Sequence, residues 1–331
     1  FNITPIKGLS IKGDYTGNKF FKQQKKHQNI LYQSQPDGTS IPQGSSNGVN
    51  NDKYNDTYQA LNLWAEYKKT IKQHSFGVMA GYNQESKKIT ALKTKVSGLY
   101  DNNTPVSDLA TTLQSIGEDA TVWAVQGMFF RLNYDYLGRY LLEVNGRYDG
   151  SSKFPTDQQW AFFPSVSGGW RVSEEAFWKV NPDLFSNLKI RASYGSLGNG
   201  NVSPYSFLEL LSISTSGRVL NGLKNKYTSA PAVMPDGLTW ETATTTDVGL
   251  DFGMLNNRLQ FNGDYYIRKT TDMYTVGETL PDVFGASSPK GNYADMTTKG
   301  WEITLTWRDQ FTLAEKPFNY EIRGTLSDYI S

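Results

Sequence analysis

The chain has 331 residues, no cysteine, and 33 basic residues against 32 acidic ones, so its formal net charge is only +1. This balance provides no overall field to attract nucleic acid, and the lack of cysteine excludes disulfides, thiolate metal sites and a cysteine nucleophile. The 20 Tyr, 17 Phe, 8 Trp and 30 Gly, beside only 38% hydrophobic residues, favour pleated strands and tight turns, so we expect an all-β protein.

Alternation of apolar and polar residues with a period of two is the main signal along the chain. In chain order it predicts strands or hairpins at residues 9–15, 61–67 with 76–82, 128–136 with 140–148, 164–172, 188–194, 247–252 with 259–268, 301–307 and 318–326. We expect about eleven strands of the length that a tilted membrane strand requires.

The clearest alternation runs over residues 259–268. It predicts that one set of side chains faces lipid and that the other faces the lumen of a barrel. The first set is Leu259, Phe261, Tyr265 and Ile267, and the second is Gln260, Asn262, Asp264 and Arg268.

The connections alternate between short and long. Short turns are expected at residues 68–74, 137–138, 254–258 and 308–317, and long polar segments at 16–57, 85–120, 150–162, 198–238 and 269–293. This layout predicts an antiparallel transmembrane β-barrel segment with short periplasmic turns and long extracellular loops. The link at 173–187 is longer than the other turns, and we expect one helical turn there, around residues 174–177.

No residues suggest catalysis. The only histidines, His27 and His74, lie far apart in lysine-rich stretches, which favours solvated side chains over a metal site or a triad. Neighbouring Glu174 and Glu175 point apart on a helix and fit a charged helix N-terminus better than a catalytic pair. We expect no enzyme, no catalytic residue, no metal and no cofactor.

Two sets of residues are candidates for a functional site. Five polar residues on predicted inward positions are expected to face the lumen, with a structural lining favoured over a substrate path: Arg131, Glu143, Arg147, Asp149 and Arg191. Seven aromatic residues in the expected loops are substrate-binding candidates that would stack on sugar rings or pack against a lid: Tyr205, Phe207, Tyr227, Trp240, Tyr274, Phe284 and Tyr293. Packing of the loops on themselves explains the aromatic residues equally well.

Four segments resemble one known family. Residues 139–154 (RYLLEVNGRYDGSSKF), 160–171 (WAFFPSVSGGWR), 188–199 (LKIRASYGSLGN) and 299–305 (KGWEITL) are similar to the barrel of SusC/RagA-like TonB-dependent transporters. The likeness covers most of the chain from about Trp123 onward and, more loosely, Leu61 to Gln84.

The resemblance implies a protein of the bacterial outer membrane in Bacteroidota, surrounded by lipid, that imports oligosaccharides or peptides. It also implies that TonB drives the uptake and that a SusD-like surface lipoprotein forms a lid. Neither a plug domain nor a closing strand is recognisable, so we expect residues 1–331 to be a partial barrel domain of a longer protein. Two alternatives stay open: a carbohydrate-binding or adhesive β-sandwich, and a passive porin.

Overall fold

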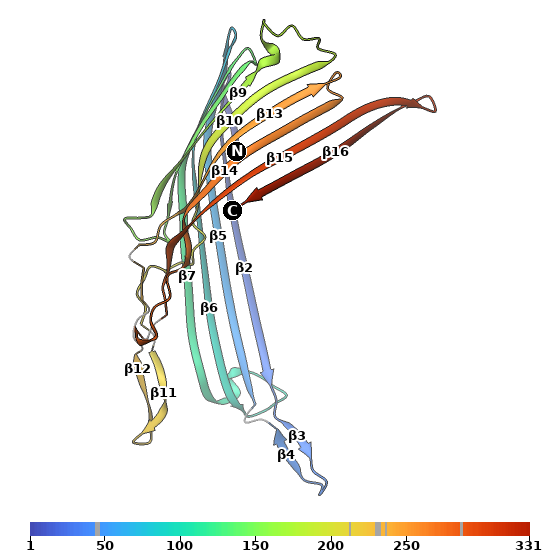
Figure 1. Cartoon of the computed structure of the whole chain (residues 1–331). Coiled ribbons are helices and arrows are strands. Elements are labelled where there is room, and N and C mark those ends of the chain that lie inside the picture. The colour runs from blue at the N-terminus through green and yellow to red at the C-terminus, as the bar shows by residue number, and fades with distance from the viewer. Residues whose placement is uncertain (44–46, 212, 229–232, 236, 285–286) are drawn as a thin grey trace. The chain divides into compact units, whose positions relative to one another are not determined.

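Strands make up most of the chain (Figure 1). The computed structural model describes residues 1–331 apart from 44–46, 212, 229–232, 236 and 285–286. The strands are β1 (Asn2–Ile6), β2 (Leu9–Gln28), β3 (Leu31–Ser34), β4 (Ser40–Gln43), β5 (Gly48–Ile71), β6 (His74–Leu99), β7 (Ala110–Tyr136), β8 (Tyr140–Ser151), β9 (Trp160–Arg171), β10 (Phe185–Asn199), β11 (Ile213–Leu220), β12 (Leu223–Thr228), β13 (Glu241–Met254), β14 (Leu259–Val276), β15 (Lys290–Leu313) and β16 (Lys316–Ile330). Three 3₁₀ turns lie between strands: η1 (Ser107–Leu109), η2 (Val172–Glu174) and η3 (Asp282–Phe284). The all-β prediction is confirmed, and none of the described helical segments has the length and apolarity to cross a bilayer.

Twelve of the described strands form one sheet in the order β1-β2-β5-β6-β7-β8-β9-β10-β13-β14-β15-β16. Each strand therefore pairs with the strands that precede and follow it, apart from two inserted hairpins. These hairpins, β3–β4 and β11–β12, form small sheets of their own (Figure 1). The sequence predicted about eleven strands and neither hairpin, because β3 and β4 have only four residues each, and β11 and β12 lie within residues 198–238, which were expected to form a polar loop.

Short turns join the strands at one end of the sheet, since alternate links of consecutive antiparallel strands lie at the same end. They span residues 7–8, 72–73, 137–139, 255–258 and 314–315. The turn predicted at 308–317 is wrong in extent, because β15 and β16 continue to a link of only Ala314 and Glu315. Both residues have positive φ, 49° and 61°, which is the backbone of a tight turn that matches the twist of paired strands.

The link between β9 and β10 is the long member of this set and covers residues 172–184. The helical turn that the sequence predicted around residues 174–177 is present as η2, but it begins earlier, at Val172, and ends at Glu174.

The polar segments predicted as loops are wrong over much of their length. Strand structure covers residues 16–28, 48–57, 85–99, 110–120, 269–276 and 290–293. As a result β5, β6 and β7 have 24, 26 and 27 residues, whereas about 9–11 residues suffice to cross a bilayer. A ladder of backbone hydrogen bonds does not depend on apolar side chains, so polar strands extend beyond the length that lipid requires.

The chain divides into two compact units. Unit 1 comprises Phe1–Asp14, Asn62–Asn83 and Val125–Ser331, and unit 2 comprises Tyr15–Leu61 and Gln84–Ala124. Unit 2 buries Val49, Val96 and Leu99, against which Ala110 packs. The Asn47 side chain accepts a hydrogen bond from the Leu99 backbone N and donates one to the Leu99 carbonyl, both at 2.8 Å. An amide side chain thus replaces a missing rung of the ladder at this small core.

Candidate functional site

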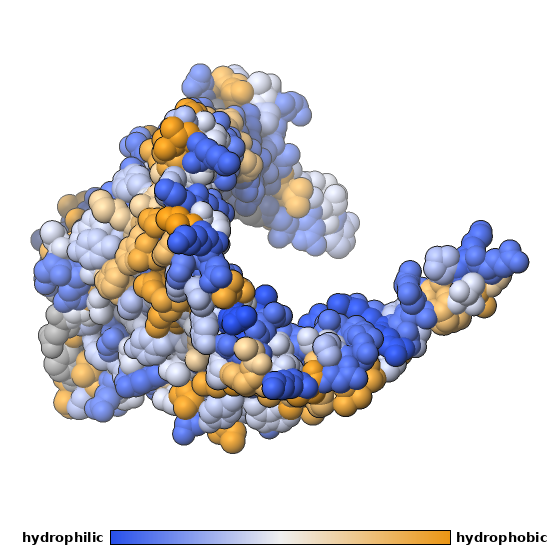
Figure 2. All heavy atoms as spheres, turned by 90° about the horizontal axis from the view of Figure 1, so that it is seen from above, coloured by the Kyte–Doolittle hydropathy of each residue, from blue (hydrophilic) through white to orange (hydrophobic). Residues whose placement is uncertain are grey.

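One face of unit 1 carries apolar side chains across neighbouring strands. In the register of β10, β13, β14 and β15, Ile190 lies opposite Leu250, and Leu250 lies opposite Gly263. On the same face, Val248 and Tyr265 remain 54% and 51% exposed. We call this the apolar face. In Figure 2, hydrophobic and hydrophilic residues gather on opposite sides of the band of atoms along the lower edge. Side chains of this kind avoid water, so this face requires an apolar surrounding.

The two sets predicted from residues 259–268 lie on opposite faces. Phe261 stacks on Phe252, with ring centroids 4.8 Å apart, on the apolar face. Asn262 donates a 2.9 Å hydrogen bond to Asp251 on the other side of the sheet. We call this second side the polar face.

The five polar candidates share the polar face, and one group of them is centred on Arg131. Its Nε donates a 2.7 Å hydrogen bond to Asn145 Oδ1 and lies 3.8 Å from Glu143 Oε1. Asn145 in turn donates to Glu143 at 2.9 Å and to Ser165 at 3.2 Å. These bonds connect β7, β8 and β9 across the face.

A second group pairs Arg147 with Asp149 along β8. The guanidinium donates from Nε at 3.0 Å and from its terminal nitrogen at 2.8 Å, which is a bidentate ion pair. The same guanidinium lies over the ring of Phe129, 5.4 Å from its centroid. Gly127 faces this pair, and a Cβ at that position would overlap the Asp149 carboxylate.

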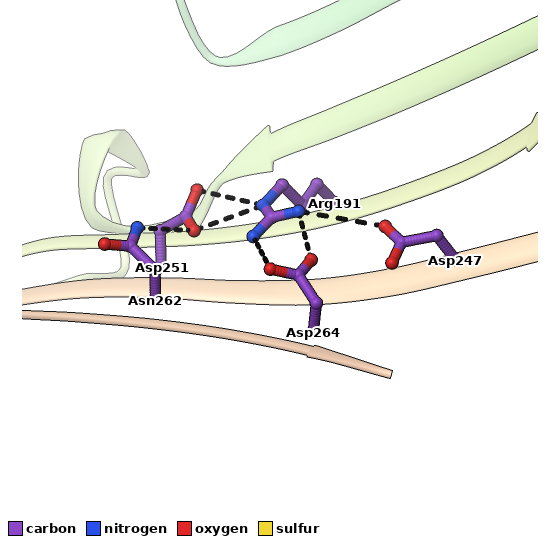
Figure 3. A network of polar contacts seen from close by, with 5 residues as sticks. All are labelled: Arg191, Asp247, Asp251, Asn262 and Asp264. Carbon is purple, nitrogen blue, oxygen red and sulfur yellow. Dashed lines mark hydrogen bonds and ion pairs between the residues drawn. The ribbon is translucent and has the colours of Figure 1, made fainter. Parts of the chain in front are cut away.

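Arg191 is the centre of the largest group (Figure 3). Its Nε donates to the two carboxylate oxygens of Asp251 at 3.1 and 3.2 Å, and its terminal nitrogens bind Asp264 in a bidentate pair. A third carboxylate, that of Asp247, lies 3.7 Å away. One guanidinium therefore links β10 to β13 and β14, and it shields three carboxylates that would otherwise repel each other.

Gly249 makes this arrangement possible. In the register it lies opposite Arg191 on one side and opposite Asp264 on the other. A Cβ at residue 249 would overlap both the Arg191 guanidinium and the Asp264 carboxylate. Because residue 249 has no side chain, the Arg191 side chain can extend across β13 and reach Asp264 in β14.

A hollow of about 380 Å³ lies between the Arg131 and Arg191 groups. Its lining includes small residues of β9 and β10, among them Ser167, Gly169 and Ser193, together with the charged residues Glu143 and Lys189. Charges of both signs in the lining suit a polar occupant. Among the described residues no cluster of three histidine, cysteine or acidic side chains could hold a metal ion.

Three of the seven aromatic candidates belong to a packed cluster in the long links of unit 1. Trp240 is 8% exposed and packs against Phe154 and Phe163, with ring centroids 5.1 and 5.6 Å away. Its indole N–H donates a 2.8 Å hydrogen bond to the Gln159 carbonyl. Partly buried candidates at the edge of this cluster are Phe207 and Tyr274. This cluster holds Phe154, in the link between β8 and β9, against Val202, Leu238 and Trp240, in the segment between β10 and β13.

The other four aromatic candidates lie outside the cluster. Tyr205, Tyr227 and Tyr293 are exposed. The prediction that all seven lie in loops is wrong for three of them, because Tyr227 is in β12, Tyr274 in β14 and Tyr293 in β15. Phe284 ends η3, and its side chain lies outside the described residues.

The sequence placed the five polar candidates on one face but did not identify the partners of Arg191. Alternation gives the face of Asp247, Asp251 and Asp264, whereas the pairing of β10 with β13 decides which of them Arg191 meets. The one sequence feature that pointed to this crossing was Gly249, a glycine in a row of otherwise polar residues.

Comparisons with known proteins agree with this geometry. Residues 4–329 match the family described as TonB dependent receptor-like, beta-barrel. TonB-dependent receptor P26 of Formosa agariphila is 30% identical over 87% of this chain and 28% of its own length. TonB-dependent receptor SusC of Bacteroides thetaiotaomicron is 32% identical over 70% of this chain and 22% of its own length. The chain thus spans less than a third of these relatives.

A solved structure has the same fold. The structure of the RagAB peptide transporter superimposes with a TM-score of 0.77 at 22% identity, over 98% of this chain and 35% of that chain. The closed-closed state of the RagAB peptide importer gives the same TM-score at 23% identity.

Proposed function

Because the chain belongs to the TonB-dependent receptor β-barrel family, we propose that it forms part of the wall of a transporter that imports oligosaccharides or peptides. Barrels of this family lie in the bacterial outer membrane, and this one does too. Its relatives SusC and RagA support the SusC/RagA-like branch. Uptake itself belongs to the whole protein, of which this chain is a part.

The observation that carries the proposal is the division of the sheet into two faces. An exposed apolar face suits contact with lipid, and a polar face bound together by Arg131, Arg147 and Arg191 suits the lining of a lumen. A β-sandwich would bury its apolar side chains in a core instead. We propose that the ion pairs stiffen the barrel wall. The hollow beside Arg191 then lies either on the substrate path or against a segment that fills the lumen.

The partners follow from the family. We propose that residues 1–331 are a partial barrel domain, that a plug elsewhere in the polypeptide contacts TonB, and that a SusD-like lipoprotein covers the outer opening. The similarity to SusC and to the RagAB peptide transporter supports this assignment. We also propose that the protein is a transporter and not an enzyme, since its known relatives are receptors and transporters.

Among the aromatic candidates, Tyr205, Tyr227 and Tyr293 are proposed to contact substrate or lid, because they are exposed. Aromatic rings at such positions can stack on sugars or on peptide side chains. Trp240, Phe207 and Tyr274 are proposed to hold the links that present them.

Uptake measurements test the proposal. The full-length protein is expressed in a Bacteroidota strain that lacks its own copy, and accumulation of fluorescent oligosaccharides and peptides is followed with and without a protonophore. We expect one substrate class to accumulate, and removal of TonB or of the proton gradient to abolish this accumulation. Uptake that continues without TonB would identify a passive porin, and no uptake of either class would reject the proposed substrates.

A further inference from the structure

A row of aromatic rings follows the apolar face near the short turns. Ring contacts run from His74 and Phe76 of β6 to Tyr134 and Tyr136 of β7, and then to β8. Beyond these, Tyr140 of β8 stacks on Trp170 of β9, with ring centroids 6.5 Å apart and planes 8° apart. Aromatic side chains at the end of a membrane strand favour the level of the lipid headgroups.

The β9–β10 link continues this row outside the strands. The Phe177 ring meets Trp170 edge-on, with centroids 6.4 Å apart and planes at 66°. It nevertheless remains 63% exposed, and Val180 and Leu184 in the same link are exposed as well. The other turns at this end need only two to four residues, so this link has a length that connection alone does not require.

Glu175 fixes the link against the ends of the strands. Its carboxylate accepts a 3.0 Å hydrogen bond from Trp170 Nε1 and lies 3.6 Å from the Arg139 guanidinium. Its backbone carbonyl accepts a 3.0 Å hydrogen bond from the Trp178 backbone N. The hydrogen bond from the Tyr140 hydroxyl, followed by that from Trp170, holds the pKa of Glu175 below its usual range. The Phe177 ring therefore has a defined position beside the aromatic row.

We propose that the β9–β10 link is an interfacial anchor that inserts Phe177 into the periplasmic phospholipid leaflet of the outer membrane. The occupant is lipid because Phe177 is continuous with Trp170, which lies on the apolar face that the proposed function places against lipid. Lys179, two residues further on, is exposed as well, and the flexible side chain of a lysine so close to Phe177 can reach lipid phosphates. The anchor sets the depth of the barrel wall at β9 and β10.

Site-directed spin labelling tests the anchor, and this chain contains no cysteine that would interfere. Phe177→Cys, Glu174→Cys and Val166→Cys are made separately in the full-length protein, with any cysteine outside this chain replaced by serine. Each labelled protein is placed in phospholipid nanodiscs, where both sides of the membrane are accessible. Power-saturation EPR then gives the accessibility of each label to oxygen, which enters lipid, and to a nickel chelate, which stays in water.

Val166 lies on the apolar face in the middle of β9 and reports lipid, and Glu174 belongs to the same link as Phe177 but is a charged, exposed residue. We expect the oxygen-to-nickel ratio at residue 177 to shift from the value at residue 174 toward the value at residue 166. A ratio at 177 equal to that at 174 overturns the anchor. A label at 177 that neither reagent reaches also overturns it, because protein then covers the ring. Loss of the lipid signal at 166 would instead contradict the assignment of the apolar face.

Discussion

Replacing Val166 by arginine tests which face of the sheet meets lipid, because the residue lies near the middle of β9 between Trp160 and Trp170. A strand residue advances about 2.5 Å along the membrane normal, from a rise of about 3.3 Å and a tilt of about 40°. Val166 therefore lies about 10 Å from the level of Trp170, close to the middle of an apolar band about 25 Å tall. Val166→Arg is expected to cost about 2–4 kcal/mol, which is the cost of an arginine at the midplane.

A second variant tests how the cost of an arginine depends on its depth in the membrane. Leu142 pairs with Gly168 on the same face, only two residues from Tyr140 of the aromatic row. It lies about 5 Å from the interface, where an arginine can extend its charged end to the headgroups. Leu142→Arg is therefore expected to cost no more than about 1 kcal/mol.

Ser167→Arg is the matched control, at the same depth but on the polar face opposite Glu143. It places the new charge beside a carboxylate, so we expect a change within about 0.5 kcal/mol. Unfolding of the full-length protein by guanidinium in phospholipid vesicles, followed by tryptophan fluorescence, gives all three free energies. Equal costs for residues 166 and 167, or a greater cost at 142 than at 166, would refute the lipid assignment.

Three further outcomes follow from the packing and charges. Gly249→Ala should separate the ion pair that crosses it and cost about 1–3 kcal/mol in the same assay, whereas Gly324→Ala, which has open space around its new Cβ, should cost nothing measurable. Trp240→Ala should lower stability by about 3–5 kcal/mol and expose links 152–159 and 200–240 to limited proteolysis, and unchanged cleavage there would contradict the packed cluster. Because the folded-state pKa of Glu175 lies below its unfolded value, its contribution is fully present at neutral pH and is lost as the pH falls through the folded pKa. Protection factors of amides in the β9–β10 link, taken relative to the intrinsic exchange rate at each pH, should therefore fall in acid for the native protein but not for Glu175→Gln, and parallel pH profiles would contradict this.

The alternation of apolar and polar residues predicted the parts of the strands that are expected to cross the membrane. A membrane strand must alternate apolar and polar side chains, so residues 128–136, 140–148 and 259–268 were recognisable without any partner. The outer parts of β5, β6 and β7 are not under that constraint. Residues such as those at 51–57 are polar and were read as loop, although cross-strand pairing holds them in β5. Their structure depends on neighbours that a single segment does not reveal.

The candidate site was also predictable only in part. Its face could be predicted, because side-chain direction has a period of two. Its partners could not, because Arg191 and Asp264 are 73 residues apart in sequence and meet only through the register of three strands. For Trp240, the sequence allowed packing of the loops on themselves as one of two explanations, but it did not identify Phe154 and Phe163 as the partners, because these residues lie far from Trp240 in the sequence.

Glycines in the polar rows carry part of the missing information. Gly249 lies where Arg191 crosses to Asp264, Gly127 faces the Asp149 carboxylate, and Gly300 lies opposite the Tyr266 hydroxyl. In each case a Cβ would overlap a long polar side chain from the neighbouring strand. A glycine in a strand loses packing and conformational entropy, so its presence in a regular polar row needs a compensating contact. At these three positions the contact is the side chain that lies over the glycine, and it is an arginine, an aspartate or a tyrosine of an adjacent strand.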